Sequence, residues 1–368
     1  MITFIFYYIS FFFICFLFVP RLTNNQVINN KLDLTILVIL FYFSLLFFGF
    51  GLFGYDTELY YDFYINTNKL SSLNLSDYKK EWGFYFLISL CKSLNISYVE
   101  FRFINMVLDL LLMFYVFRYF LEKKLWSFAF VIYLLFGGLY YNIEAIRNGK
   151  SILFFLIALK YLNLKKYCKF VLYCFFSLCF HVSAVFLIFS CFFYKLFLKK
   201  KLVFFVFCLG LILSISGKGF GSILLSLQDK LPGQIGYLIL IYATHPTYNV
   251  GHGLSIGLLE RIVSFFIVYK YQDEVLKDYS FSKYFIAFMY IYIFLCFYFL
   301  DFTIVYERLA SLFKIGYWVL FPIIFNYQNG KQKNRIYFIL FFYGLLKVYQ
   351  NYNNVVYLPN QFILDNGF

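Results

Sequence analysis

The sequence predicts an all-α membrane protein with about twelve transmembrane helices, one short re-entrant or interfacial helix and long outer loops, in a single domain over residues 1–368. Three observations predict this fold. The chain is 63% hydrophobic with a mean hydropathy of +0.76, whereas soluble domains are about 45–50% apolar. Its apolar residues form runs of about 20, the length that crosses a bilayer as a helix. The charged residues gather between these runs.

The predicted spans follow one another along the whole chain. They cover residues 2–19, 34–54, 101–120, 125–142, 144–164, 167–180, 182–198, 202–219, 256–270, 284–300, 308–326 and 336–350. The first run has neither a basic start nor a small-residue cleavage site, so we interpret it as a span and not as a signal peptide. Residues 84–94 are apolar but short and contain Lys92. This favours a re-entrant or interfacial helix, with a short span as the alternative.

The distribution of lysine and arginine predicts the orientation of the spans. If residues 20–33 face the cytoplasm and the spans alternate, the cytoplasmic segments carry a basic excess equal to the whole net charge of +14. This agrees with the positive-inside rule. Both termini and the long loops 55–83 and 220–255 are then expected outside. A soluble protein with this charge would suggest nucleic acid, but here the membrane accounts for it and we expect no nucleic-acid partner.

The cysteines and histidines do not form a recognisable metal pattern. The eight cysteines have no CxxC spacing and lie mostly within apolar runs, and the chain has three histidines. Buried, unreactive thiols are therefore expected in place of a metal site or a disulfide framework. We expect no metal and no cofactor.

A charged stretch stands between two uncharged apolar runs and is the first candidate site. It contains Glu144, Arg147 and Lys150. Charges at the mouth of a membrane helix are costly unless they are solvated or paired, which makes them functional candidates. Glu144 and Arg147 are three residues apart on one expected helical face, so a simple ion pair is one interpretation. In the other, Arg147 binds an anion, Glu144 holds its guanidinium and Lys150 adds a second charge.

Other polar residues fall at predicted outer ends of spans or inside them. His181 interrupts two apolar runs, so it is either a structural hydrogen-bonding residue or a general base, with Ser183 as a plausible partner. Asp56 lies in a tyrosine-rich outer loop, where carboxylates either meet water or accept hydrogen bonds from sugar hydroxyls. Asp109 lies in the middle of a predicted span, where a hydrogen bond between packed helices is expected.

Several short motifs follow one another in an order that resembles a known family. They are Gly54-Tyr55-Asp56, Glu81-Trp82-Gly83-Phe84, Ile146-Arg147, Phe180-His181-Val182-Ser183-Ala184 and Glu307-Arg308-Leu309. Their order, spacing and common predicted side resemble the EpsG family of polysaccharide-biosynthesis membrane proteins, relatives of the Wzy-type O-antigen and capsule polymerases. The chain departs from the family pattern after Arg147, where Asn148 replaces the usual Gln, and at Trp82, where the family tends to have Pro.

The resemblance implies a polymerase that joins oligosaccharide repeat units carried on undecaprenyl diphosphate. Arg147 and Lys150 would stabilise the negative charge of the leaving lipid diphosphate. His181 or Asp56 would deprotonate the acceptor hydroxyl, and Arg308 would contact the diphosphate of the second lipid. The remaining expected substrate-binding residues are Glu144, Tyr55, Tyr60 and Glu81.

The same resemblance implies a location and partners. The protein would be a multi-pass protein of the bacterial cytoplasmic membrane with its active site facing outward. Its expected partners are the lipid-linked oligosaccharides, membrane lipid, a chain-length regulator and a flippase. Two other classes stay open. A polytopic glycosyltransferase that uses a polyprenyl-phosphate sugar would suit Asp56, whereas a flippase or transporter is less favoured because no internal repeat is evident.

Overall fold

The computed structural model describes residues 56–74, 81–216, 219–227, 230, 237, 256–300 and 305–355. Every regular element among these residues is a helix, so the all-α prediction is confirmed for them. The chain divides into two compact units, Met1–Val185 with Phe325–Phe368, and Phe186–Ile324. Each unit is described by itself. That the two units form one membrane domain stays a prediction.

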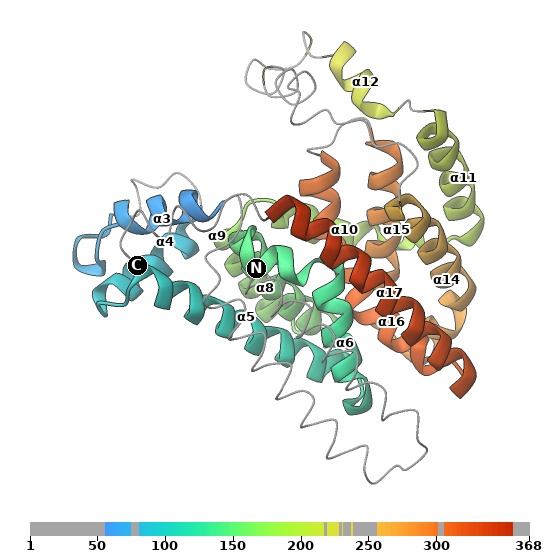
Figure 1. Cartoon of the computed structure of the whole chain (residues 1–368), viewed down its shortest axis with the longest axis horizontal. Helices are drawn as coiled ribbons and strands as arrows, with labels where there is room; N and C mark the ends of the chain where they lie inside the picture. Colours follow the sequence, from blue (N-terminus) through green and yellow to red (C-terminus); the bar gives the residue numbers. More distant parts are fainter. Residues whose placement is uncertain are drawn as a thin grey trace. The chain divides into compact units, whose positions relative to one another are not determined.

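The first unit begins with a small aromatic cluster built from three helices. These are α3 (Thr57–Asn66), α4 (Trp82–Ser93) and α5 (Tyr98–Phe120), drawn in blue to cyan in Figure 1. Tyr60 and Tyr64 lie one turn apart on α3, and both are buried against Phe84 and Phe101. The predicted outer loop 55–83 therefore contains an ordered helix whose buried face is aromatic.

Two polar interactions fix the ends of these helices. Lys92 on α4 donates to the carbonyls of Ile65 (2.8 Å) and Thr67 (2.6 Å) at the end of α3, where a cation stabilises the helix dipole. Ser97 and Glu100 form a capping box that starts α5. A contact from α4 thus stabilises the end of α3, and a local cap sets where α5 begins.

The centre of the first unit is α8 (Ile146–Asn163), most of whose side chains are buried. It packs along α9 (Tyr167–Phe180) and against α5, and the three helices lie together in Figure 1. This packing holds the first turn of α8 close to the end of α9.

The run that we predicted as one span over 125–142 is interrupted. It contains α6 (Trp126–Tyr133), a π-helical segment η5 (Leu134–Gly138) and the short α7 (Leu139–Ile143). Within η5 the backbone of Gly137 has φ 117°, a conformation that L side chains rarely adopt and that glycine tolerates. The backbone turns again at Ala145 before α8 starts at Ile146, two residues later than predicted.

The second unit is centred on α15 (Ser282–Tyr298), which is buried almost all round. It packs against α11 (Lys200–Ser216), α14 (Ile256–Asp278) and the π-helical η7 (Val305–Ala310). An ion pair of 2.6 Å between Lys200 and Asp273 joins α11 to α14.

The remaining described elements of the two units are η2 (Leu70–Ser72), η4 (Lys123–Leu125), α10 (Ala184–Phe197), α12 (Phe220–Ser226), α16 (Ile315–Asn326) and α17 (Gly330–Val355).

Exposed apolar side chains support a membrane environment. Val171 and Phe175 on α9 are 62% and 54% exposed, and Phe189 and Phe192 on α10 are 58% and 65% exposed. Large exposed apolar side chains along a helix are typical of contact with a membrane or a partner. Among the described helices, α5 alone is long and apolar enough to cross a bilayer, while α9, α10, α15 and α16 are apolar but shorter. Twelve spans therefore stay a prediction, and the first two lie outside the described residues.

Candidate functional site

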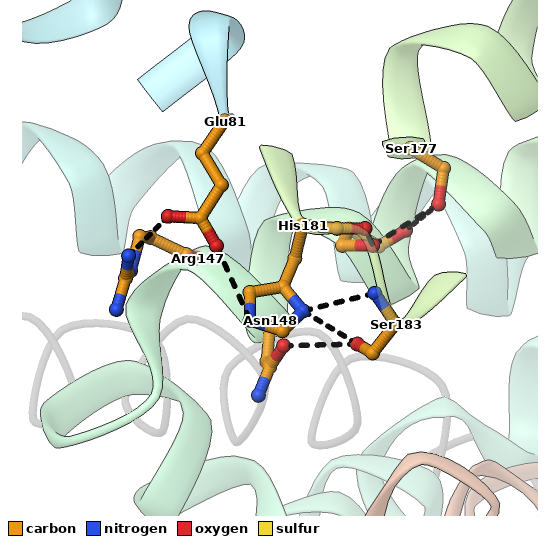
Figure 2. A network of polar contacts seen from close by, with 7 residues as sticks. Glu81, Arg147, Asn148, Ser177, His181 and Ser183 are labelled. Atoms are coloured by element: carbon orange, nitrogen blue, oxygen red, sulfur yellow. Dashed lines mark hydrogen bonds and ion pairs between the residues drawn. The ribbon is translucent and has the colours of Figure 1, made fainter. Parts of the chain in front are cut away.

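Three charged or titratable side chains from distant parts of the first unit meet at one place. Glu81 immediately precedes α4, Arg147 lies in the first turn of α8, and His181 ends α9. The Glu81 carboxylate forms an ion pair with the Arg147 guanidinium through one oxygen. Its other oxygen lies 3.3 Å from His181 Nε2, so the carboxylate bridges the two residues (Figure 2).

The backbone around Glu81 is adapted to this arrangement. Glu81 has φ 65° and ψ 36°, in the left-handed region, which costs a non-glycine residue about 1–2 kcal/mol. Backbone strain of this kind persists where the surrounding structure requires it and is common at functional sites. Gly83, two residues later, permits a close approach of α4 to α9, since a Cβ there would lie 3.2 Å from the Cβ of Cys179. This approach brings Glu81 beside His181.

Aromatic rings hold the guanidinium of Arg147. Its central carbon lies 5.6 Å from the centroid of the Tyr60 ring and 5.2 Å from that of Phe63, both on α3. Such cation–π contacts fix the plane of the guanidinium. The side chain is 20% exposed, and its ion pair with Glu81 uses only Nη1 of the guanidinium, while its Nε is buried without a hydrogen-bond partner among the described residues. Arg147 therefore has donors left for a ligand after it has paired with Glu81.

His181 belongs to a chain of hydrogen bonds that leads away from Glu81. Its Nδ1 lies 2.6 Å from Ser183 Oγ and 3.2 Å from the Ser183 backbone nitrogen, which donates to it. Ser183 Oγ in turn lies 3.2 Å from Asn148 Oδ1. Ser151 Oγ lies 3.2 Å from Ser177 Oγ and donates to the backbone carbonyl of His181 at 3.5 Å, so these serines join α8 to the end of α9. The imidazole is thus oriented from both sides.

The comparison with known families decides which kind of protein carries this site. The model of the EpsG family matches residues 34–364, nearly the whole chain. The chain belongs to the EpsG family. Comparisons with curated proteins and with solved structures gave no match. Membership confirms the resemblance seen in the motifs and supports a membrane protein of polysaccharide biosynthesis.

The partner of Arg147 in this EpsG-family protein differs from our expectation. We expected Glu144 to share a helical face with Arg147, but α7 ends at Ile143 and the backbone at Ala145 is not helical. Glu144 therefore lies outside the helix that carries Arg147. The carboxylate that pairs with the guanidinium is Glu81, which we had expected to contact sugar.

Lys150 also differs from our expectation that its charge joins Arg147 at the anion. Its side chain is 2% exposed and pairs with Asp109 on α5 at 2.7 Å, while also donating to the carbonyl of Asn105 at 3.2 Å. A buried cation requires a counter-charge because desolvation costs several kcal/mol. Lys150 therefore joins two packed helices. The predicted helix-packing role of Asp109 is confirmed, as an ion pair.

The other predicted residues are distributed over both units and the undescribed segments. Asp56 lies at the start of α3, one turn before Tyr60. The Tyr60 backbone N–H donates to the Asp56 carbonyl at 2.9 Å and its ring lies 5.6 Å from the Arg147 guanidinium carbon; burial raises the pKa of the Tyr60 phenol above its ordinary value, although Arg147 lowers it. Arg308 is exposed and belongs to η7 of the second unit. Tyr55 and most of loop 220–255 lie outside the described residues.

Sequence reasoning missed two residues at this site. Arg102 is 4% exposed, with its guanidinium 5.9 Å from the centroid of the Tyr60 ring. An arginine near the start of a largely apolar predicted span was a signal that could have identified it. Asn148 was noticed as a departure from the family pattern and not as a contact of Ser183. No local pattern indicates that contact, because it depends on α8 meeting the end of α9.

The chemistry available at the site has two parts. Arg147 offers a planar guanidinium with spare donors, which suits a phosphate or diphosphate. Glu81, His181 and Ser183 form a chain from carboxylate to imidazole to hydroxyl, an order of groups that can accept and hold a proton. The arrangement can therefore stabilise an anion beside a proton acceptor.

Proposed function

We propose that this EpsG-family protein is a polysaccharide polymerase. It joins oligosaccharide repeat units carried on undecaprenyl diphosphate, at the outer face of the bacterial cytoplasmic membrane, to make an O-antigen, capsule or exopolysaccharide. The observation that carries the proposal is the bridge from Arg147 through Glu81 to His181. Transfer of a glycan from a lipid diphosphate requires a cation for the leaving group and a base for the acceptor, and this site offers both.

Arg147 acts on the leaving group. Negative charge develops on the diphosphate as its bond to the sugar breaks, and fixed donors aimed at that charge lower the barrier. The Glu81 carboxylate and the rings of Tyr60 and Phe63 hold the guanidinium in one orientation before the substrate arrives. Orienting the donors beforehand means that little reorganisation is needed during the reaction.

The acceptor requires a base, and the diphosphate of the second lipid requires a further cation. His181 takes the acceptor proton, and Asp56 beside Tyr60 is the alternative base. Arg308 contacts the second diphosphate. The partners are the lipid-linked oligosaccharides, the surrounding lipid, a flippase that delivers the repeat units and a chain-length regulator.

The product of the reaction tests the function. A host strain that lacks this gene is complemented with the full-length chain, and its cell-surface polysaccharide is separated by size. A polymerase gives a ladder of many repeat units from the intact gene and single units without it. A glycosyltransferase that uses a polyprenyl-phosphate sugar would change the composition of the repeat unit. A flippase would leave repeat units accumulated on the inner leaflet when it is absent. Either result would contradict the proposal.

The outward location of the site has its own test. Ser72 in η2 belongs to the predicted outer loop, whereas Gln332 in α17 belongs to a predicted cytoplasmic segment. Single cysteines at these positions, placed in a variant without the native cysteines, are treated with a membrane-impermeant thiol reagent on intact cells. We expect labelling at 72 and none at 332. Labelling at position 332 from outside would contradict the predicted topology.

A further inference from the structure

The surroundings of His181 restrict how it can act as a base. Its Nε2 lies 3.3 Å from Glu81. Its Nδ1 accepts from the Ser183 backbone N–H at 3.2 Å and lies 2.6 Å from Ser183 Oγ (Figure 2). Both ring nitrogens therefore already face protein groups. A sugar hydroxyl cannot contact Nδ1 without displacing the hydroxyl of Ser183.

We propose that Ser183 relays the acceptor proton to His181, and that Asn148 positions the Ser183 hydroxyl for this transfer. The proposal rests on the proposed function, because it concerns how the acceptor sugar of the polymerase loses its proton. Ser183 and Asn148 are both partly exposed, so a sugar hydroxyl can reach them. His181 then acts through Ser183 and not by direct contact with the sugar.

The orientation of Ser183 supports this role. Ser183 immediately precedes α10, a place where serine usually accepts a hydrogen bond from an amide of the helix that follows. The described contacts of its hydroxyl are instead with His181 and Asn148. A hydroxyl has one proton, so it cannot donate to both partners at once: it donates to Asn148 Oδ1 in the described geometry and turns to Nδ1, 2.6 Å away, when it gives its proton to neutral His181. Once His181 is protonated, Nδ1–H donates to Ser183, and the Ser183 hydroxyl donates to Asn148.

The proposed step balances in protons and electrons. The acceptor O–H bond breaks and its proton passes to Ser183 Oγ, while the proton of Ser183 moves to His181 Nδ1. The acceptor oxygen bonds to the anomeric carbon of the growing chain, and the bond from that carbon to the diphosphate oxygen breaks. The electron pair leaves with the lipid diphosphate beside Arg147. Glu81 stabilises the imidazolium, which releases its proton to water after the products depart.

Two isosteric pairs at position 183 test the relay. Membranes that contain the full-length chain receive lipid-linked repeat units extracted from a strain lacking the gene, and the initial rate of polymer formation is divided by protein abundance. Ser183→Ala should lower this rate by about 10²-fold or more, the contribution of a proton-transfer group. Ser183→Thr should stay close to the wild type, whereas Ser183→Val, which has the same shape without the hydroxyl, should be as slow as Ser183→Ala.

A control variant and a double variant distinguish a proton-relay role of Ser183 from a packing role. Ser177→Ala removes a buried hydroxyl that bonds to Ser151 and does not face the imidazole. It should leave the rate per molecule unchanged. In the His181→Gln background, Ser183→Ala should cause little further loss, because residues that act in one step are not additive. Fully additive losses would mean that Ser183 acts independently of His181 and would overturn the relay.

The proposed relay and the proposed function are contradicted by different results. Polymer formed at the wild-type rate by Ser183→Ala would overturn the relay while leaving the polymerase intact. If Ser183→Ala does not accumulate in the membrane, the Thr and Val variants decide, and equal rates from these two would overturn the relay. Wild-type membranes that make no polymer from the same lipid-linked units would refute the proposed function itself.

Discussion

Two cations one turn apart on α8 have contrasting surroundings. Arg147 and its partner Glu81 are 20% and 11% exposed, whereas Lys150 and its partner Asp109 are both 2% exposed. Arg147 rests on aromatic rings and has donors left over, while Lys150 is held by a carboxylate and a carbonyl inside the helix packing. From sequence both residues looked like anion ligands. Burial distinguishes them, because a ligand can reach only the first.

The largest expected effect comes from breaking the buried pair. Asp109→Leu leaves the Lys150 ammonium without its carboxylate, which should destabilise the protein by about 3–5 kcal/mol. We expect loss of folded protein from the membrane, measured by abundance and by thermal stability in detergent. The double variant Asp109→Leu with Lys150→Met should recover both, because apolar replacement of both partners is often neutral. A normally abundant Lys150→Met protein that makes no polymer would instead assign Lys150 to the site.

Variants of the more accessible pair, Arg147 with Glu81, should lose activity while the protein stays folded. Arg147→Lys keeps the charge and loses the planar fork, so polymer formation should fall by about 10²–10³-fold, as for loss of one transition-state donor. Protein abundance should stay normal. Arg118→Lys, an exposed arginine in the last turn of α5, is the matched control. Full-length polymer from the Arg147→Lys variant would reduce Arg147 to a structural charge.

The carboxylate that joins the two halves of the site has a smaller expected effect. Glu81→Gln keeps the shape and removes the charge that orients Arg147 and stabilises protonated His181. Hydrogen bonds to charged groups contribute about 1.5–3 kcal/mol, so turnover should fall by about 10–100-fold. The optimum pH for polymer formation should also change, because the charge next to the imidazole is lost. A slower enzyme with an unchanged pH profile would mean that Glu81 acts on Arg147 alone.

The smallest effect is expected at the residue that we first paired with Arg147. Glu144→Gln should change turnover by no more than about twofold, since Glu144 lies outside the helix that carries Arg147 and the guanidinium pairs with Glu81. The measurement is the same polymer ladder with abundance in parallel. A loss as large as that of Glu81→Gln would restore Glu144 as the carboxylate that holds Arg147.

The sequence by itself determined the all-α class, the EpsG family and the candidacy of Arg147 and His181. Those conclusions depend on local properties, namely long apolar runs and short motifs that are read along the chain. It also indicated Asp109 as a packing residue, because a carboxylate inside a membrane helix needs a partner. The break in the predicted span before Ile146 was less visible, since hydropathy remains high through Gly137 while the backbone changes direction.

Only the tertiary structure decided which partner each side chain has. Glu81 reaches Arg147 across 66 residues of sequence, and Lys150 reaches Asp109 across 41. Neither contact has a local signature, because each depends on how closely α4, α5, α8 and α9 pack. For example, the close approach of α4 to α9 at Gly83 brings Glu81 beside His181. An ion pair depends on distance in space and on burial, and sequence spacing fixes these only within a single helix.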